Sequence, residues 1–242
     1  PLKRINKIKP GQTFRVPILL YHYVENVTDQ RDTIRKSLNI PPAIFDKQIE
    51  TLLNAKYNFI TVSDLADVLD DKKYMPANPI ILTIDDGHWD LNTDILPILK
   101  KYNVRATAYI APGLIGGSDY LTKDQLQNVV DSGLVEIGAH TVHHLYLKGK
   151  LAPIVQYEIN QGKTILENDY HVKVVSFAYP YGAFDDFSIA TTKEAGFRAA
   201  VSTLPGVEQS QSNLFYLYRI RPGQHVGQSL VNLLSQTTFR PW

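Results

Sequence analysis

The 242-residue sequence contains no cysteine, so disulfide bridges and thiolate metal sites are excluded. Any bound metal must therefore be held by histidine nitrogen or by carboxylate or backbone oxygen. No apolar run approaches the ~20 residues that a transmembrane helix needs. Neither sign of charge is in excess, since 25 Lys and Arg residues stand against 24 Asp and Glu residues and the net charge is +1. This balance gives no electrostatic reason to expect binding to nucleic acid or to a membrane surface.

Basic residues do cluster near the start of the chain, at Lys3, Arg4, Lys7, Lys9 and Arg15. We expect residues 1–15 to form a solvated basic arm ahead of a single domain that spans residues 16–242. The chain begins at Pro1 rather than at a methionine, which fits a removed signal peptide or anchor as well as a trimmed product.

With 44% hydrophobic and 20% charged residues, the composition is that of a globular protein. One face of a helix that begins near Pro153 is marked by Val155, Ile159, Gly162 and Leu166. Strands and helices alternate along the whole chain, which predicts an α/β protein with a mostly parallel sheet, open or closed into a barrel. Apolar segments predict buried strands at residues 16–21, 59–62, 80–84, 106–110, 135–138, 174–178, 199–202 and 217–220.

The sequence also predicts one long loop and the ends of two helices. Residues 25–38 are polar without a clear period, so we expect them to form a long loop. Ser63 is placed to cap a short helix. A further helix is expected at residues 92–102, where Pro97 is tolerable only in the first turn.

Polar residues directly follow several of the predicted strands. The strand at 80–84 runs into two adjacent carboxylates, and the strand at 135–138 precedes a cluster of histidines. In parallel sheets and barrels the carboxyl ends of the strands share one edge, where active sites are built. We therefore expect one rim to carry His22, Asp85, Asp86, His140, His144 and Tyr181.

His140 and His144 with one carboxylate make a set of two nitrogens and one oxygen, which suits zinc or another divalent first-row metal. Because adjacent strand residues point to opposite faces, Asp85 and Asp86 are not expected to bind the metal together. One of them would ligate, and the other would accept a proton from water. That arrangement is suited to the hydrolysis of a carbonyl compound.

His143 is not expected to be a ligand, and two other interpretations of the pair His140 and His144 are weaker. His143 lies between the two candidate ligands at the wrong spacing, so we expect it to be structural. The helical zinc-protease motif needs glutamate next to its first histidine, and Thr141 stands there instead. A non-haem iron oxygenase uses the same ligand types, but its carboxylate usually stands two residues from a histidine, and none does so around His140 or His144.

Three short motifs resemble those of the polysaccharide deacetylases, carbohydrate esterase family four, which have the NodB-homology fold. Residues 83–87, Thr-Ile-Asp-Asp-Gly, resemble the first motif, Thr-Phe-Asp-Asp-Gly. Residues 140–144, His-Thr-Val-His-His, match the second, His-Ser/Thr-x-x-His, and residues 179–182, Tyr-Pro-Tyr-Gly, resemble the third. The resemblance spans roughly residues 16–220 and implies a distorted (β/α) barrel of about seven strands.

The family pattern also implies roles for individual residues. It implies that Asp85 is the general base and that Asp86, His140 and His144 hold the metal. It further implies that the backbone N–H of Tyr181 helps to stabilise the oxyanion. The metal expected from this resemblance is Zn²⁺, with Co²⁺, Ni²⁺ or Mn²⁺ as alternatives.

Two positions depart from the family pattern. Ala178 stands where the third motif usually carries an arginine that orients the base, and the candidates for a replacement cation are Arg219 and Arg221. The late motif that supplies the acid in much of the family is absent, and His225 is a poor match to it. Residues 20–24, Leu-Tyr-His-Tyr-Val, resemble the start of the poly-N-acetylglucosamine deacetylase branch, in which an early histidine is the acid. This resemblance implies His22 as the acid.

The resemblance thus predicts a metal-dependent hydrolase that removes N-acetyl groups from a hexosamine polymer, such as poly-N-acetylglucosamine, peptidoglycan or a chitin-like glycan. The expected partner is the acetylated polysaccharide, and the expected location is extracellular or attached to the cell surface. Two alternatives stay open: an O-acetyl esterase of the acetylxylan type, and a carbohydrate-binding protein that kept the metal site. Candidates for an aromatic sugar platform are Trp89, Tyr23, Tyr179 and Tyr181.

Overall fold

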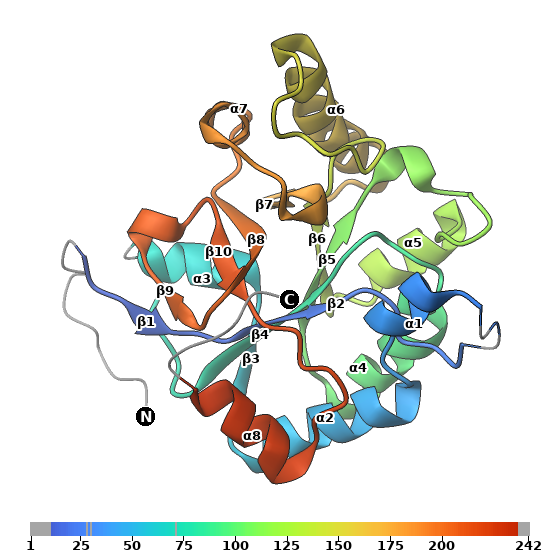
Figure 1. Cartoon of the computed structure of the whole chain (residues 1–242), viewed down its shortest axis with the longest axis vertical. Coiled ribbons are helices and arrows are strands. Elements are labelled where there is room, and N and C mark those ends of the chain that lie inside the picture. Colours follow the sequence, from blue (N-terminus) through green and yellow to red (C-terminus); the bar gives the residue numbers. More distant parts are fainter. Residues whose placement is uncertain (1–10, 28, 30, 71, 237–242) are drawn as a thin grey trace.

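The computed structural model of the chain describes residues 11–27, 29, 31–70 and 72–236. Within these ranges, seven strands run parallel in the order β2, β4, β5, β6, β7, β8 and β10 (Figure 1). An eighth parallel strand, β3 (Asn58–Ile60), pairs with β4 beside this path. The bounds of the seven are β2 Ile18–Tyr21, β4 Pro79–Ile84, β5 Ala106–Ile110, β6 Val135–Ala139, β7 Ser176–Ala178, β8 Ala199–Pro205 and β10 Leu217–Arg219.

The first and last strands of this series meet, which closes the sheet into a barrel. The N–H of Leu20 donates to the carbonyl oxygen of Ile220, and the N–H of Ile220 donates to that of Ile18, both at 2.8 Å. The predicted α/β class and the distorted (β/α) barrel of about seven strands are therefore confirmed. Closure places the carboxyl ends of all seven strands around one rim.

Side chains of alternate strand residues form two separate cores. On β4, Ile81 belongs to the cluster inside the barrel, whereas Leu82 belongs to the larger cluster outside it. Helix α3 (Val62–Leu69) shares the inner cluster, and the N–H of Val62 donates to Oγ1 of Thr107 near the start of β5 at 3.2 Å. Helix α3 thus covers the amino end of the barrel and leaves the carboxyl end open.

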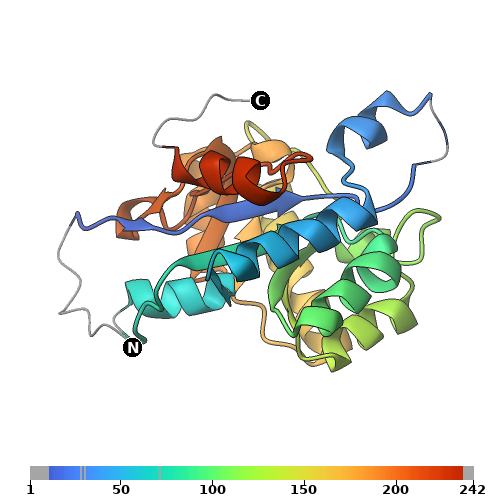
Figure 2. The same cartoon turned by 90° about the horizontal axis from the view of Figure 1, so that it is seen from below.

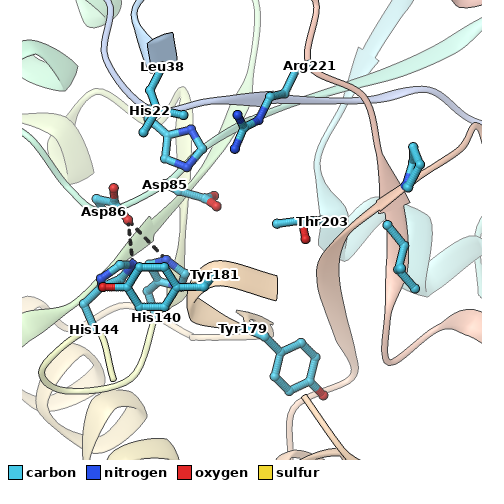
Figure 3. A pocket seen from close by; sticks show the side chains of 12 residues that line it. His22, Leu38, Asp85, Asp86, His140, His144, Tyr179, Tyr181, Thr203 and Arg221 are labelled. Atoms are coloured by element: carbon cyan, nitrogen blue, oxygen red, sulfur yellow. Dashed lines mark ion pairs between the residues drawn. The ribbon is translucent and has the colours of Figure 1, made fainter. Parts of the chain in front are cut away.

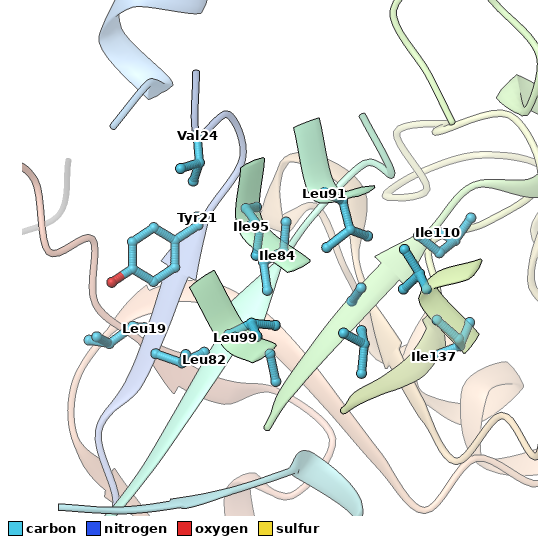
Figure 4. Close-up of a cluster of buried hydrophobic side chains, with 14 of the residues drawn as sticks. Leu19, Tyr21, Val24, Leu82, Ile84, Leu91, Ile95, Leu99, Ile110 and Ile137 are labelled. Carbon is cyan, nitrogen blue, oxygen red and sulfur yellow. The ribbon is translucent and has the colours of Figure 1, made fainter. Parts of the chain in front are cut away.

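The outer cluster lies between the strands and the surrounding helices (Figure 4). In the described ranges the other helices are α1 Thr33–Leu38, α2 Pro42–Asn54, α4 Leu96–Tyr102, α5 Lys123–Asp131, α6 Ala152–Tyr170, α7 Asp186–Glu194 and α8 Gly227–Ser235. Helices α2 and α8 lie side by side (Figures 1 and 2), where the N–H of Gly227 donates to Oγ1 of Thr51 at 2.9 Å. The predicted apolar face of α6 is confirmed, because its four residues, Val155, Ile159, Gly162 and Leu166, are all buried.

The segment at residues 25–38 was predicted to be a loop, and this is wrong for its second half, which forms α1. The helix begins because the side chain of Asp32 accepts the N–H of Arg35 at 2.8 Å. None of its residues is buried, so no apolar period marks it in the sequence.

Two other boundaries also differ from the sequence prediction. The segment expected as one helix at 92–102 is a π-helical turn, η1 (Leu91–Ile95), followed by α4, which has Pro97 in its first turn. The cap of α3 is Thr61 rather than Ser63, because Thr61 and Asp64 satisfy each other's backbone N–H groups as a capping box.

Short elements complete the described chain. Strands β1 (Phe14–Arg15) and β9 (Glu208–Gln209) pair antiparallel beside the barrel, while residues 1–10 of the expected arm lie outside the described residues. Among the described helices, none has the length and apolar character needed to cross a membrane. Three 3₁₀ turns are η2 Pro112–Leu114, η3 Pro180–Gly182 and η4 Gln211–Asn213.

Replacing Gly138 of β6 with alanine is predicted to destabilise the barrel. A Cβ at this position would lie 2.5 Å from two ring carbons of Tyr109 and 3.1 Å from the carbonyl oxygen of Ser176. Overpacking of this kind costs ~1–3 kcal/mol, which we expect as a loss in the free energy of unfolding measured by chemical denaturation. The same substitution should cost less in a Tyr109→Leu background, and equal costs in both backgrounds would contradict this explanation.

Candidate active site

A cavity of about 390 Å³ opens at the carboxyl ends of the strands (Figure 3). Its walls come from the segments that follow β2, β4, β6 and β7, together with residues near the ends of β8 and β10. All of the residues that the sequence placed on one rim line this cavity, namely His22, Asp85, Asp86, His140, His144 and Tyr181.

Asp86, His140 and His144 form a cluster whose potential ligand atoms all lie within 4.8 Å of one another. Oδ1 of Asp86 is 3.2 Å from Nε2 of His140 and 3.2 Å from Nε2 of His144 (Figure 3). The backbone is left-handed at Asp86 (φ 77°) and at Gly87 (φ 80°), so the chain turns sharply after β4 and brings Asp86 to the two histidines.

The chemistry of this cluster fits a divalent cation. Nδ1 of His140 lies 2.7 Å from the carbonyl oxygen of Ala178, which can only accept, so the neutral ring carries its proton on Nδ1 and presents the lone pair of Nε2 to the cluster. Oδ1 of Asp86 is buried and receives no well-aligned hydrogen bond from the described residues. Burial raises the pKa of Asp86, but its contacts with His140, His144 and His88 outweigh burial and hold the pKa well below its usual range. Imidazole nitrogens that converge on a carboxylate are the donors that zinc prefers.

Asp85 forms a bidentate ion pair with Arg219 of β10, with both N–O distances at 2.7 Å. The buried guanidinium also donates to the carbonyl oxygen of Ser202 at 2.7 Å and to Oγ1 of Thr83 at 3.1 Å. Burial raises the pKa of Asp85, but the charge of Arg219 and its hydrogen bonds outweigh burial and lower the pKa overall. Arg219 therefore supplies the cation that the third motif lacks at Ala178.

His22 follows β2 and points into the same cavity as Arg221 (Figure 3). Burial lowers the pKa of His22, and the carboxylates of Asp86 and Asp85 offset this only in part. His225, the other candidate acid, does not line the cavity, and its carbonyl oxygen accepts a hydrogen bond from Gln48 at 2.9 Å. The geometry therefore favours His22 over His225.

One contact of the cluster, made by His88, was missed by the sequence analysis. Nε2 of His88 is 3.3 Å from Oδ2 of Asp86, and its Nδ1 is 3.1 Å from the carbonyl oxygen of Asp119. The ring of His88 is stacked between Tyr23 and Tyr120, at centroid distances of 4.1 and 4.9 Å. The position of His88, two residues after Asp86, could have marked it in the sequence as a neighbour of the cluster. Its stacking partners could not be predicted in this way, because Tyr23 and Tyr120 lie in loops far from His88 along the chain.

The candidate aromatic platform is present only in part. Tyr181 is 65% exposed, and its ring centroid lies 4.6 Å from that of His144 and 6.3 Å from that of Tyr146. Tyr179 reaches the cavity wall but is otherwise buried in the outer core, and Trp89 does not line the cavity. Tyr146, which the sequence analysis did not single out, is 46% exposed beside Tyr181.

A closed parallel barrel that gathers carboxylates and histidines at the open carboxyl end has the architecture of barrel enzymes. The model of one family, Polysaccharide deacetylase, matches residues 72–200. The chain belongs to this polysaccharide deacetylase family, as its three motifs predicted.

Individual relatives cover most of the chain. The Bacillus subtilis protein YxkH, which is named for the same family, is 27% identical over 214 residues, with 88% of this chain and 74% of its own covered. Poly-β-1,6-N-acetyl-D-glucosamine N-deacetylase of Staphylococcus aureus is 26% identical over 199 residues, covering 76% of this chain and 68% of its own.

Two solved structures share the fold. The Streptococcus pyogenes deacetylase PplD, in complex with acetate, has a TM-score of 0.84 and 26% identity, with 94% of this chain and 100% of its own covered. IcaB from Ammonifex degensii has a TM-score of 0.78, with 91% of this chain and 95% of its own covered. Its sequence identity is 21%, so this similarity shows a shared fold only.

Removing the positive charge of Arg219 is predicted to raise the pKa of Asp85. In the folded protein this pKa lies below its ordinary value of 3.8, so the ion pair stabilises the fold above that pH, and the stabilisation is lost as the pH falls through the lowered pKa. In Arg219→Met the largest opposition to burial is gone, with only the weaker effects of His140 and His22 remaining, and we expect the pKa to rise by at least ~1 unit in a carbon-13 NMR titration of the metal-free protein. Arg219→Lys keeps the charge and is the matched control. An unchanged titration in Arg219→Met would contradict the assignment.

Proposed function

We propose that the protein is a metal-dependent hydrolase that removes N-acetyl groups from a hexosamine polymer. The observation that carries this proposal is the pairing of Asp85 with Arg219 next to the Asp86–histidine cluster in one cavity. Membership of the family supports a polysaccharide as the substrate. The S. aureus relative named for poly-β-1,6-N-acetyl-D-glucosamine supports an N-acetylated hexosamine polymer in particular.

The cation would be held by Oδ1 of Asp86, Nε2 of His140 and Nε2 of His144. Zn²⁺ suits two imidazoles and one carboxylate best, while Co²⁺, Ni²⁺ and Mn²⁺ accept the same donors. When bound there, a divalent cation would polarise the acetyl carbonyl and lower the pKa of a water molecule. The ring of His88, stacked between Tyr23 and Tyr120, packs against Oδ2 of Asp86 and would restrict the rotation of that carboxylate.

Asp85 would accept the proton of the attacking water. Its lowered pKa keeps it ionised at neutral pH, which a general base requires. Each carboxylate oxygen can accept more than one hydrogen bond, so the pairing with Arg219 leaves acceptor capacity for water. The bidentate geometry would also fix the direction in which those remaining lone pairs point.

His22 would donate a proton to the departing nitrogen. Because burial lowers the pKa of His22, its protonated form is a stronger acid than an exposed imidazolium. The backbone N–H of Tyr181 would donate to the oxyanion, a contribution of ~3 kcal/mol for a preorganised donor. Tyr181 has a left-handed backbone (φ 59°) within the turn η3 and lines the cavity.

The proposed substrate also suggests where and how the chain acts. Acetylated hexosamine polymers of this kind are outside the cell, so we propose an extracellular or surface-attached location, with residues 16–242 acting as one catalytic domain.

An O-acetyl esterase would use the same residues and is the nearest alternative. The alternative of a binding protein was raised by the missing arginine at Ala178, and the ion pair of Arg219 with Asp85 supports an enzyme instead.

Protein reconstituted with Zn²⁺ should release acetate and free amine in equal amounts from N-acetylglucosamine oligomers, and chelated protein should release neither. Both products are measured in the same reaction, with O-acetylated xylan oligomers assayed in parallel. Acetate released only from the O-acetylated oligomers would favour the esterase. Oligomers that are retained but never hydrolysed would favour a binding protein.

Substitution of the proposed base or acid should lower turnover without loss of the metal. Asp85→Asn and His22→Asn are each expected to reduce kcat by ~10²–10⁴-fold, because each removes one proton-transfer group. Zinc content, measured by atomic absorption, should stay at the wild-type level in both variants. His225→Asn is the matched control and should retain activity. Full activity in His22→Asn, or its loss in His225→Asn, would contradict the assignment of the acid.

A further inference from the structure

Glu158 of α6 is a buried carboxylate, 4% exposed, that the proposed mechanism does not use. Its Oε2 accepts the backbone N–H groups of Val142 and His143, both at 2.9 Å. Its Oε1 lies 2.7 Å from Nδ1 of His143. These three contacts all go to the short loop between the candidate ligands His140 and His144.

The same loop is also held by backbone and helix packing. The N–H of Gly113 in η2 donates to the carbonyl oxygen of Val142 at 2.9 Å. A Cβ at Gly162 would lie 2.9 Å from the carbonyl carbon and oxygen of Thr141, so α6 rests directly against the loop. The loop is therefore enclosed between η2 on one side and α6 on the other.

The backbone of this loop needs such support. Thr141 (φ 61°) and His144 (φ 55°) are non-glycine residues in the left-handed region, which persists only where surrounding contacts determine it. The two N–H groups that Glu158 accepts belong to the residues between these two positions. Without the carboxylate, the loop would lose three of the contacts that oppose relaxation toward ordinary backbone angles, and the ring of His144 would shift relative to Asp86.

We propose that Glu158 is a positioning residue for the metal site, which acts through the backbone of residues 142–143 and through the ring of His143. This role rests on the proposed metal site formed by Asp86, His140 and His144. It gives His143, expected from the sequence to be structural, a defined part as the side-chain contact of Glu158. Substitution of residues that orient metal ligands typically lowers metal affinity about 10- to 100-fold, and that is the effect expected here.

The chain offers a matched control in Glu136 of β6. Its carboxylate also accepts a backbone N–H, that of Ser63 at 3.2 Å, and the Ser63 hydroxyl. These contacts hold the start of α3 at the amino end of the barrel, away from the cavity. Glu136→Gln therefore disturbs a comparable carboxylate contact without touching the loop that carries the histidines.

The experiment compares wild type, Glu158→Gln, Glu158→Ala and Glu136→Gln as full chains. Zn²⁺ affinity is measured by competition with a chromophoric chelator, coordination by the visible absorption of Co²⁺, and stability by the Tm of the metal-free protein. We expect Zn²⁺ to bind about 10-fold more weakly to Glu158→Gln and up to about 100-fold more weakly to Glu158→Ala, with an altered Co²⁺ spectrum. Glu136→Gln should lower Tm while Zn²⁺ affinity stays at the wild-type value.

Wild-type Zn²⁺ affinity in Glu158→Gln would overturn the proposal, and so would an equal loss of affinity in Glu136→Gln. Glu158→Gln has nearly the size and shape of the wild-type residue, so it carries the test if Glu158→Ala does not fold. The readout is metal binding and not turnover. Wild-type protein that binds Zn²⁺ but releases no acetate would contradict the proposed function and leave this role intact. Wild-type protein that binds no Zn²⁺ would overturn both.

Discussion

The ion pair between Arg219 and Asp85 is the interaction on which the interior of the barrel depends. A guanidinium with no exposed surface is tolerable only when its donors are satisfied, and here Asp85, Thr83 and the carbonyl oxygen of Ser202 accept from it. Because Arg219 lies on the last strand, β10, and Asp85 follows β4, the pair also ties the closing strand to the strand beyond its neighbour β2. Buried ion pairs add little net stability over apolar packing, so the main effect of this one is to keep a carboxylate charged inside the barrel.

Backbone strain is concentrated at the open rim of the barrel. Among the described residues, eight non-glycine residues have a left-handed backbone, and four of them are at the candidate site: Asp86, Thr141, His144 and Tyr181. Each of these costs of order 1–3 kcal/mol and persists because neighbouring elements over-determine it. The α3 helix covers the opposite end, so the rim can be shaped for its chemistry while the two cores below supply the stability.

The parts of the site that follow one strand could be predicted from the sequence, because apolar runs end directly in polar residues at Asp85 and His140. What the sequence could not supply was contact between distant segments. Arg219 was one of two candidates from the sequence, and only closure of the barrel brings it, rather than Arg221, into the ion pair with Asp85. The stacking of His88 between two tyrosines depends on three separate loops. Helix α1 was missed because it buries no side chain and therefore leaves no apolar period.

The central claim is that the chain holds a single catalytic metal at the rim of the barrel. Crystals grown with Zn²⁺ and measured on both sides of the zinc absorption edge test it most directly. The account predicts one anomalous peak ~2.0–2.2 Å from Oδ1 of Asp86, Nε2 of His140 and Nε2 of His144. The remaining coordination positions should face Asp85 and His22 in the cavity. A peak bound by other residues, or no peak at saturating Zn²⁺, would contradict the account.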